Sequence, residues 1–339
     1  MSCEKKSARV MRKRSHCDET LCRSGGALIV LAVCMPVSSM AAHTYTAFDP
    51  AGSTQTVPLG INNQRAVTGY YLDGSGNRHG FVRTPDGTVT SFDASGSSGT
   101  TPESINNRGV IAGGYSDRGA RGFVRAADGT ITTFQYEAYT WPNSINDKGE
   151  ITGVASGGET TWGFVREPDG SMTSFDAPGA IATVPKSINK SAEVTGTYST
   201  IGNMNHGFLL GADGMVTFDF PGSTGTFPQS INDDGVITGY YSDSAGTHGF
   251  KRATDGTITT IDARGATATE ALSINDRGVV TGTCDVRKGS FVRSPAGNTT
   301  NFAFPGSTQT AAAAINRTGA IAGSYTDGNR QQHGFVRTR

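Results

Sequence analysis

The sequence predicts an all-β protein: a closed seven-bladed β-propeller with four strands in each blade and an N-terminal strand that completes the last blade. Three observations lead to this prediction. A unit of about 43 residues repeats along the chain, each copy contains four short strand-like segments, and the two ends of the chain share one copy between them. Four-stranded repeats of this length are typical of propeller blades, which cannot bury their own faces alone and must stack on one another.

Residues 230–262 show the repeated unit most clearly. Runs rich in β-branched and aromatic residues alternate there with turn formers, and we expect strands near 236–241, 249–252 and 257–261 after a first strand that ends at Ile231-Asn232. The dipeptide Asp255-Gly256 lies between two of these runs. It predicts a type I′ hairpin turn, because both central residues of that turn need a positive φ.

Three positions recur in every copy. An Ile-Asn pair ends the first strand at intervals of 40 to 44 residues, with its isoleucines at Ile61, Ile105, Ile145, Ile188, Ile231, Ile274 and Ile315. A glycine lies in the second strand, at Gly69, Gly113, Gly153, Gly196, Gly239, Gly282 and Gly323. A phenylalanine lies in the third strand, at Phe81, Phe123, Phe164, Phe208, Phe250, Phe291 and Phe335. We expect the glycine to permit close backbone approach and the phenylalanines to pack between blades.

The last repeat lacks a fourth strand after Phe335. Residues 44–49 (Thr-Tyr-Thr-Ala-Phe-Asp) match the fourth-strand pattern of residues 90–93 and 173–176. An N-terminal strand that supplies the missing one would close the ring and cover sheet edges that an open stack would expose.

Residues 1–42 differ from the repeats. Seven basic residues precede an apolar run at 25–35, and the small-residue segment Ser39-Met40-Ala41-Ala42 follows. This order is typical of a secretory signal peptide. The run of 11 residues is also short beside the roughly 20 that span a bilayer. We therefore predict a cleaved leader at 1–42 and a propeller at 43–339 that is secreted or periplasmic, with no membrane attachment after cleavage.

The composition of residues 43–339 excludes some functional classes. Of 29 basic and 29 acidic residues, the leader holds seven and three, which leaves 22 and 26. The resulting net charge near −4 argues against nucleic acid or anionic lipid as a partner. Four of the five cysteines lie in the leader, so no disulfide framework is expected and Cys284 is interpreted as a core residue. We expect a monomer.

A short triplet points to a family. Four copies read His-Gly-Phe, beginning at His79, His206, His248 and His333, and the turn at 105–109 reads Ile-Asn-Asn-Arg-Gly. These motifs resemble the HAF-type extracellular repeats of bacteria over the whole of residues 43–339, with Gly where that family has Ala. The resemblance implies an exported repeat protein and no catalytic residue.

The two faces of such a propeller differ in sequence. The loops before the first strand and between the second and third lie on one face, here called the loop face, and the Ile-Asn and Asp-Gly turns lie on the opposite turn face. The histidines of the triplets recur once per blade, as do aspartates at the ends of fourth strands: Asp49, Asp93, Asp176, Asp219 and Asp262. We interpret them as turn-capping and packing residues, because blades across a ring are too far apart to share a metal. No catalytic, cofactor or metal motif is expected.

One blade departs from the pattern. Residues 135–142 read Gln-Tyr-Glu-Ala-Tyr-Thr-Trp-Pro where other copies have small residues, and a tryptophan replaces the triplet histidine. The predicted ligand-binding residues are Tyr136, Glu137, Tyr139, Trp141, Glu159 and Trp162. Aromatic rings stack on the C–H face of sugars and carboxylates accept bonds from hydroxyls. The alternative is that both tryptophans fill space between loops.

Two functional classes follow. The first is an exported, non-catalytic binding module for a polysaccharide or cell-surface glycan, favoured because no assembled catalytic constellation is visible. The second is a propeller-type polysaccharide lyase or glycoside hydrolase.

Overall fold

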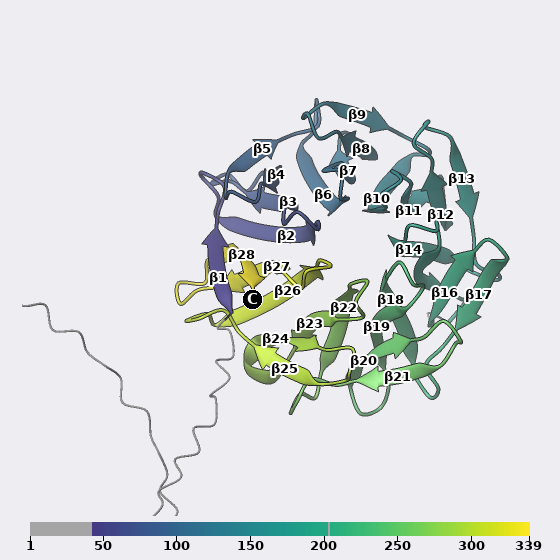
Figure 1. The fold of residues 1–339 in the computed structure, drawn as a ribbon. Helices are drawn as coiled ribbons and strands as arrows, with labels where there is room; N and C mark the ends of the chain where they lie inside the picture. The colour runs from purple at the N-terminus through teal and green to yellow at the C-terminus, as the bar shows by residue number, and fades with distance from the viewer. Residues whose placement is uncertain (1–42, 203) are drawn as a thin grey trace, which may run out of the picture. The chain divides into compact units, whose positions relative to one another are not determined.

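The structure, a computed structural model, describes residues 43–202 and 204–339, and the predicted leader lies outside them. Its regular structure is 28 β-strands and one short 3-10 turn, η1 (Val286–Lys288), so the all-β prediction is confirmed. Consecutive strands form antiparallel four-stranded units arranged around a central axis, with the first strand of each unit innermost and the fourth at the rim (Figure 1). A unit is named below after its first strand.

The bounds of the strands follow the repeat. The β2, β6, β10 and β14 units comprise β2 (Gln55–Ile61), β3 (Val67–Leu72), β4 (Arg78–Arg83) and β5 (Val89–Phe92); β6 (Gly99–Ile105), β7 (Ile111–Ser116), β8 (Ala120–Arg125) and β9 (Ile131–Phe134); β10 (Tyr139–Ile145), β11 (Ile151–Ser156), β12 (Thr161–Arg166) and β13 (Met172–Phe175); β14 (Ala182–Ile188), β15 (Val194–Ser199), β16 (Asn205–Gly211) and β17 (Gly214–Phe218). The β18, β22 and β26 units comprise β18 (Gly225–Ile231), β19 (Ile237–Ser242), β20 (Thr247–Arg252) and β21 (Ile258–Ile261); β22 (Thr269–Ile274), β23 (Val280–Cys284), β24 (Gly289–Arg293) and β25 (Thr299–Phe302); β26 (Gln309–Ile315), β27 (Ile321–Thr326) and β28 (Gln332–Thr338), with β1 (Thr44–Phe48) as the fourth strand.

The predicted Asp-Gly turn has a different geometry from the expected one. Only Gly256 has a positive φ, at 89°, so the type I′ prediction is wrong. The turn spans residues 253–256 and is closed by the Gly256 N–H, which donates to the Ala253 carbonyl at 3.0 Å. The loop includes Ala253 and Thr254 as well as Asp255 and Gly256, so it is longer than the two-residue loop of a type I′ hairpin. It is the hairpin loop in which a type I turn ends on a glycine with left-handed backbone conformation.

The second-strand glycines allow a close backbone approach, as predicted. The first strand of each unit carries a one-residue bulge beside this glycine, for example between Pro58 and Gly60 opposite Gly69. A Cβ on Gly69 would lie 2.1 Å from the Val57 carbonyl oxygen. Since that distance is far below van der Waals contact, the bulge requires glycine.

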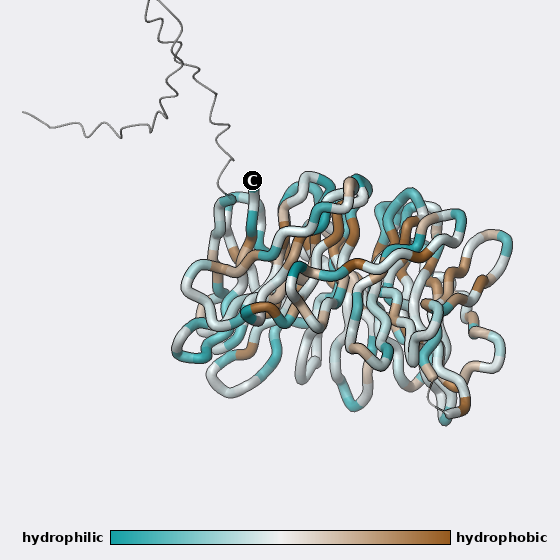
Figure 2. Tube along the Cα trace, turned by 90° about the horizontal axis from the view of Figure 1, so that it is seen from below, coloured by the Kyte–Doolittle hydropathy of each residue, from teal (hydrophilic) through white to brown (hydrophobic). Residues whose placement is uncertain are grey.

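Phenylalanine rings form the contacts between neighbouring units. The third-strand phenylalanines are fully buried, and five fourth-strand phenylalanines pack edge-on against the third-strand ring of the next unit, as in Phe92–Phe123 with centroids 6.0 Å apart. An arginine at the end of the third strand covers the outer ring, as Arg125 covers Phe92 at 4.9 Å. In Figure 2 hydrophobic segments run through the strands and hydrophilic ones gather at the turns of both faces. The prediction that phenylalanines pack between units is confirmed.

The two ends of the described chain meet in one sheet. Strand β1 pairs antiparallel with β28, from Thr44 opposite Thr338 to Phe48 opposite Gly334. The buried asparagines of the Ile-Asn pairs add a second connection: each side-chain amide donates to the backbone carbonyl of the next asparagine, and Asn316 donates to Asn62 at 2.9 Å. Within the described ranges, no helix is long and apolar enough to cross a membrane.

Candidate functional site

Two aromatic side chains lie together at the inner edge of the loop face. Tyr139 is the first residue of β10, and Trp141 lies two positions along the same strand, so both side chains point to one side. Their rings are stacked, with centroids 6.4 Å apart and planes 21° apart. Tyr139 is 42% exposed, whereas most large apolar side chains of the described chain are buried. The pair offers an accessible aromatic surface.

A hydrogen bond and a glycine hold Trp141 in place. Its indole N–H donates to Oε1 of Glu103, on β6 of the neighbouring unit, at 2.9 Å. The indole covers Gly114 on β7, where a Cβ would lie 2.4 Å from the ring. Burial raises the pKa of Glu103, while the Trp141 hydrogen bond and the charges of Lys186 and Arg78 oppose that rise. No pattern in the sequence indicates Glu103, because only the fold brings it beside Trp141.

Three of the other four predicted residues lie together in a separate group, and Glu159 lies apart from them. Tyr136 packs against the core ring of Phe164, and Trp162 on β12 lies partly buried against the same core cluster. The Glu137 carboxylate and the edge of the Trp162 ring both border Gly157. Glu159 is exposed on the loop between β11 and β12. The structure thus brings together Tyr139 and Trp141 in one group, and Tyr136, Glu137 and Trp162 in another.

Neighbouring units show why Trp162 is partly buried. In four units the triplet histidine stacks on a second-strand tyrosine, as in Tyr241–His248, with centroids 5.3 Å apart. In the β10 unit the paired residues are Ala155 and Trp162. Ala155 is smaller than the tyrosine of the other units, and Trp162 is larger than their histidine. The combined volume of the two side chains is therefore similar to that of a Tyr–His pair. This exchange favours packing as the role of Trp162.

The four triplet histidines each bind an aspartate at the end of a fourth strand. The Nδ1 to carboxylate distances are 2.6–2.9 Å for the pairs His79–Asp93, His206–Asp219, His248–Asp262 and His333–Asp49. The hydrogen bond that His79 donates to the Asp93 carboxylate raises the pKa of His79. Asp73 caps the preceding loop, and its bonds from Asn77 lower its pKa to about 2. Each pair belongs to a separate unit, and no group of three or more metal-ligating side chains occurs among the described residues.

A pocket of about 420 Å³ opens between the β22 and β26 units. Its polar lining includes Glu270, Thr283, Asp285 and Gln309. Ala311 holds on β26 the position that Trp141 holds on β10, so the β22–β26 junction lacks the ring that Trp141 places between the β6 and β10 units. Cys284, which occupies the position of the second-strand tyrosine of other units, also lines the pocket. Burial raises the pKa of its thiol.

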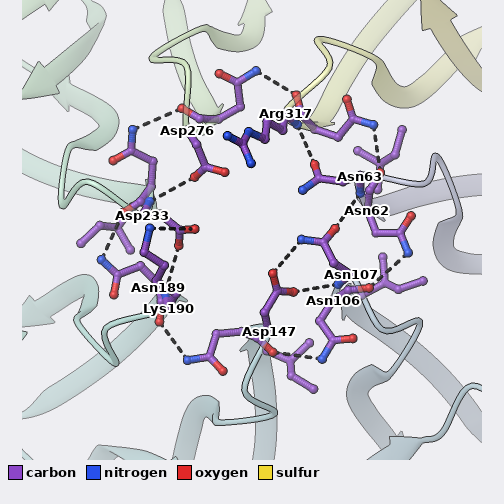
Figure 3. A pocket seen from close by; sticks show the side chains of 18 of the residues that line it. Asn62, Asn63, Asn106, Asn107, Asp147, Asn189, Lys190, Asp233, Asp276 and Arg317 are labelled. Carbon is purple, nitrogen blue, oxygen red and sulfur yellow. Dashed lines mark hydrogen bonds and ion pairs between the residues drawn. The ribbon is translucent and has the colours of Figure 1, made fainter.

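The turn face carries a second, central pocket, which lies on the axis and has a volume of about 210 Å³ (Figure 3). All the Ile-Asn pairs line it, together with the residue that follows each asparagine. These following residues are Asn63, Asn107, Asp147, Lys190, Asp233, Asp276 and Arg317. From the sequence, the asparagines of these turns were expected only to form the turns. The signal in the sequence is the variable residue after the asparagine, which is charged in five of the seven copies.

Most polar groups around the central pocket bind one another. Asn107 donates from its backbone and its side chain to the Asp147 carboxylate, at 2.8 and 2.7 Å. Asp233 accepts from the Lys190 backbone at 3.1 Å and lies 3.5 Å from the Lys190 ammonium. The next turns differ, because a carboxylate oxygen of Asp276 and the guanidinium of Arg317 have no hydrogen bond or ion pair within the described part of the chain.

Solved structures of similar fold include two lyases. A catalytically inactive virginiamycin B lyase from Staphylococcus aureus, with quinupristin, superposes with a TM-score of 0.64 at 12% identity, over 88% of this chain and 100% of that chain. A streptogramin B lyase gives 0.60 at 12% identity, over 87% and 98%. The β-propeller domain of Myceliophteria thermophila Cps50 (Swd1) gives 0.53 at 8% identity, over 87% and 98%.

The chain has a β-propeller fold. At these identities the likeness shows the fold alone. No protein-family model matches the chain, and no curated protein matches its sequence. The resemblance to HAF-type repeats therefore stays a hypothesis.

Proposed function

We propose that this protein is an exported, non-catalytic β-propeller that binds a carbohydrate through its loop face. The observation that carries the proposal is the stacked, accessible pair Tyr139–Trp141, held by Glu103 and Gly114. A preorganised aromatic surface binds the C–H face of a sugar ring without the cost of ordering flexible side chains. Glu137 and Glu159, both exposed on neighbouring loops, supply acceptors for hydroxyl groups.

The proposed architecture is a closed ring of seven blades, with β1 completing the last. The β1–β28 pairing supports it, as does the chain of asparagine hydrogen bonds that returns from Asn316 to Asn62. The signal-peptide pattern of residues 1–42 supports export to the periplasm or the medium, and the resemblance to HAF-type repeats agrees with it. The partner we propose is a polysaccharide or cell-surface glycan, bound by a monomer.

A polysaccharide retention assay tests the binding proposal. The purified protein is passed over immobilised bacterial and plant polysaccharides, and we expect retention on at least one. Tyr139→Ala and Trp141→Ala are expected to weaken retention about tenfold each, equivalent to roughly 1.4 kcal/mol. Ile201→Ala is the matched control, because Ile201 is an apolar residue of the next unit that is 89% exposed.

Two results would overturn the binding proposal. One is the absence of retention on every polysaccharide tested. The other is a Trp141→Ala variant that folds and is retained as well as the unmodified protein.

A second candidate function is a propeller-type polysaccharide lyase or glycoside hydrolase, and Glu103 is the observation that favours it. A carboxyl group whose pKa is raised by burial can donate a proton near neutral pH, as general acids of glycoside-cleaving enzymes do. Lys186 and Arg78 are close enough to oppose the rise of that pKa. Their charges would also attract an acidic polysaccharide.

The two candidates differ in their products. Incubation of the protein with the same polysaccharides, followed by assays for new reducing ends and for unsaturated sugars, detects hydrolysis and elimination respectively. If Glu103 is the acid, Glu103→Gln abolishes cleavage and leaves retention in place. Retention without any new products supports the binding module alone.

A further inference from the structure

We propose that the central pocket of the turn face is a separate binding site for a small zwitterion, a molecule of α-amino-acid size with one ammonium and one carboxylate group. The ring of turn residues around this pocket leaves some of its polar groups without a partner in the described ranges. Asn107 and Asp147 bind each other, and so do Lys190 and Asp233. Both Asp147 oxygens thus accept hydrogen bonds within the ring, although the Asp147 charge remains, and the charges of Lys190 and Asp233 balance each other.

The unused groups lie on three consecutive turns. Asp276 accepts the Asp233 N–H with Oδ1 at 3.2 Å, which leaves Oδ2 without a partner in the described ranges. Asn63 accepts the Arg317 N–H with Oδ1 at 2.8 Å, so its side-chain NH₂ is not needed for the ring. The Arg317 guanidinium lies at the rim of the opening between these two residues (Figure 3). The turns that carry Asp276 and Arg317 are neighbours, since Asn275 donates to the Asn316 carbonyl at 2.8 Å.

These groups match opposite ends of a zwitterion. The guanidinium presents parallel N–H donors that fit a carboxylate, and the Asn63 amide adds another donor. The Asp276 carboxylate accepts from an ammonium group. Asp276 Oδ2 and the Arg317 guanidinium are the charged groups that the ring leaves without a hydrogen-bond partner in the described ranges, so a ligand with both charges satisfies each of them, whereas a singly charged ligand satisfies only one.

The shape and lining of the pocket limit the ligand further. A volume of about 210 Å³ is below the roughly 300–1,000 Å³ of pockets that hold drug-sized molecules. The lining holds Ile, Asn, Asp, Lys and Arg and no aromatic ring, so it has no surface on which a sugar would stack. The chemistry therefore differs from that of the Tyr139–Trp141 pair on the opposite face.

Titrations with a matched set of small molecules test the proposal. L-Alanine carries both charges, L-alaninamide only the ammonium, and propionate only the carboxylate. Binding to the purified protein is followed by saturation-transfer NMR and calorimetry at low salt. We expect saturable binding of L-alanine and at least fivefold weaker binding of the two singly charged analogues.

Two variants and one control assign the site. Asp276→Asn keeps an oxygen for the Asp233 N–H, and Arg317→Gln changes an exposed side chain that makes no contact needed for the fold. Each is expected to weaken L-alanine binding at least fivefold. Asp147→Asn removes an equal charge from the same pocket, but at a carboxylate already bound by Asn107, and is expected to change binding less than twofold.

Three outcomes would overturn the proposal: no saturable binding of L-alanine, equal binding of propionate and L-alanine, or an effect of Asp147→Asn as large as that of Asp276→Asn. Circular dichroism establishes that each variant folds. The Trp141→Ala variant should bind L-alanine normally, so failure of the carbohydrate proposal and failure of this one remain distinguishable.

Discussion

The indole N–H of Trp141 donates a hydrogen bond to the Glu103 carboxylate, 2.9 Å away and 38 positions earlier in the chain. The bond joins the inner strands of two neighbouring units. It orients the indole over Gly114 and leaves Tyr139 stacked on its outer side. The accessible aromatic surface therefore depends on residues of two units.

Gly114→Ala is expected to disturb this surface. The added methyl would lie 2.4 Å from the indole, so the ring must move and its hydrogen bond to Glu103 must lengthen or break. We expect weaker polysaccharide retention and a loss of about 1–3 kcal/mol in the free energy of unfolding, typical of overpacking. Tryptophan fluorescence and denaturant titration measure the two effects. Gly158→Ala is the control, because a Cβ there meets nothing within 4 Å. Equal behaviour of the two variants would contradict the prediction.

Trp162→Ala is expected to lower stability more than ligand binding. Trp162 packs against the core cluster around Phe164, so truncation leaves a cavity. We expect a loss of about 3 kcal/mol, the lower end of the range for aromatic truncation, because the ring is only partly buried. Thermal and denaturant unfolding measure it, with the exposed Glu159→Ala as control. An unchanged melting curve together with lost retention would instead place Trp162 in the ligand site.

Deletion of residues 42–49 is expected to lower the melting temperature by several degrees. The change removes β1, its pairing with β28, the His333–Asp49 bond of 2.6 Å and the contact between Phe48 and Phe81. It also exposes the edge of β28, which favours association. Differential scanning calorimetry and light scattering measure both effects. A melting temperature equal to that of the full protein would argue against a closed ring.

The His79–Asp93 bond is expected to make stability depend on pH. The pKa of His79 is raised in the folded protein, chiefly by the hydrogen bond that His79 donates to the Asp93 carboxylate. A raised pKa means that protonation of His79 stabilises the folded state. This stabilisation is fully present below the pKa of histidine in the unfolded chain, about 6.5, and is lost as the pH rises through the pKa of His79 in the folded protein. His79→Gln should therefore lower the melting temperature more at pH 5.5 than at pH 8.5.

The β6 unit offers a control for this pH effect. Arg121 occupies the histidine position there and stays charged throughout this pH range. Arg121→Gln should lower the melting temperature equally at the two pH values. If both variants showed the same pH dependence, the effect would come from the overall charge of the protein and not from His79.

Local patterns in the chain were sufficient to predict much of the fold. Residues 225–261 form four strands close to the expected places, because β-branched runs and turn residues act over a few positions. Gly69 needed no structure to be recognised as a site of close approach. The prediction of the turn type at Asp255-Gly256 was wrong. The turn type depends on the loop length, and the loop length depends on which residues form the last hydrogen-bonded pair between the two strands.

The candidate site was predictable only in part, and Trp162 and Glu103 show why. Both tryptophans stand out in the sequence as large rings at positions where other copies have smaller residues. Whether such a ring is accessible depends on its neighbours: Ala155 leaves room for Trp162 inside its unit, whereas Gly114 and Glu103 hold Trp141 at the inner edge of the loop face.

The sequence by itself determined the repeat, the strand order and the positions that must be glycine or phenylalanine, because these follow from local conformational preference and from the burial that every copy shares. The tertiary structure alone decided which side chains meet across units. Asn316 finds Asn62 only when the units surround a common axis, 254 positions apart in the chain. The central pocket exists for the same reason, since each turn contributes an Ile-Asn pair and the residue that follows it, and the enclosure results from the arrangement of the turns around the axis.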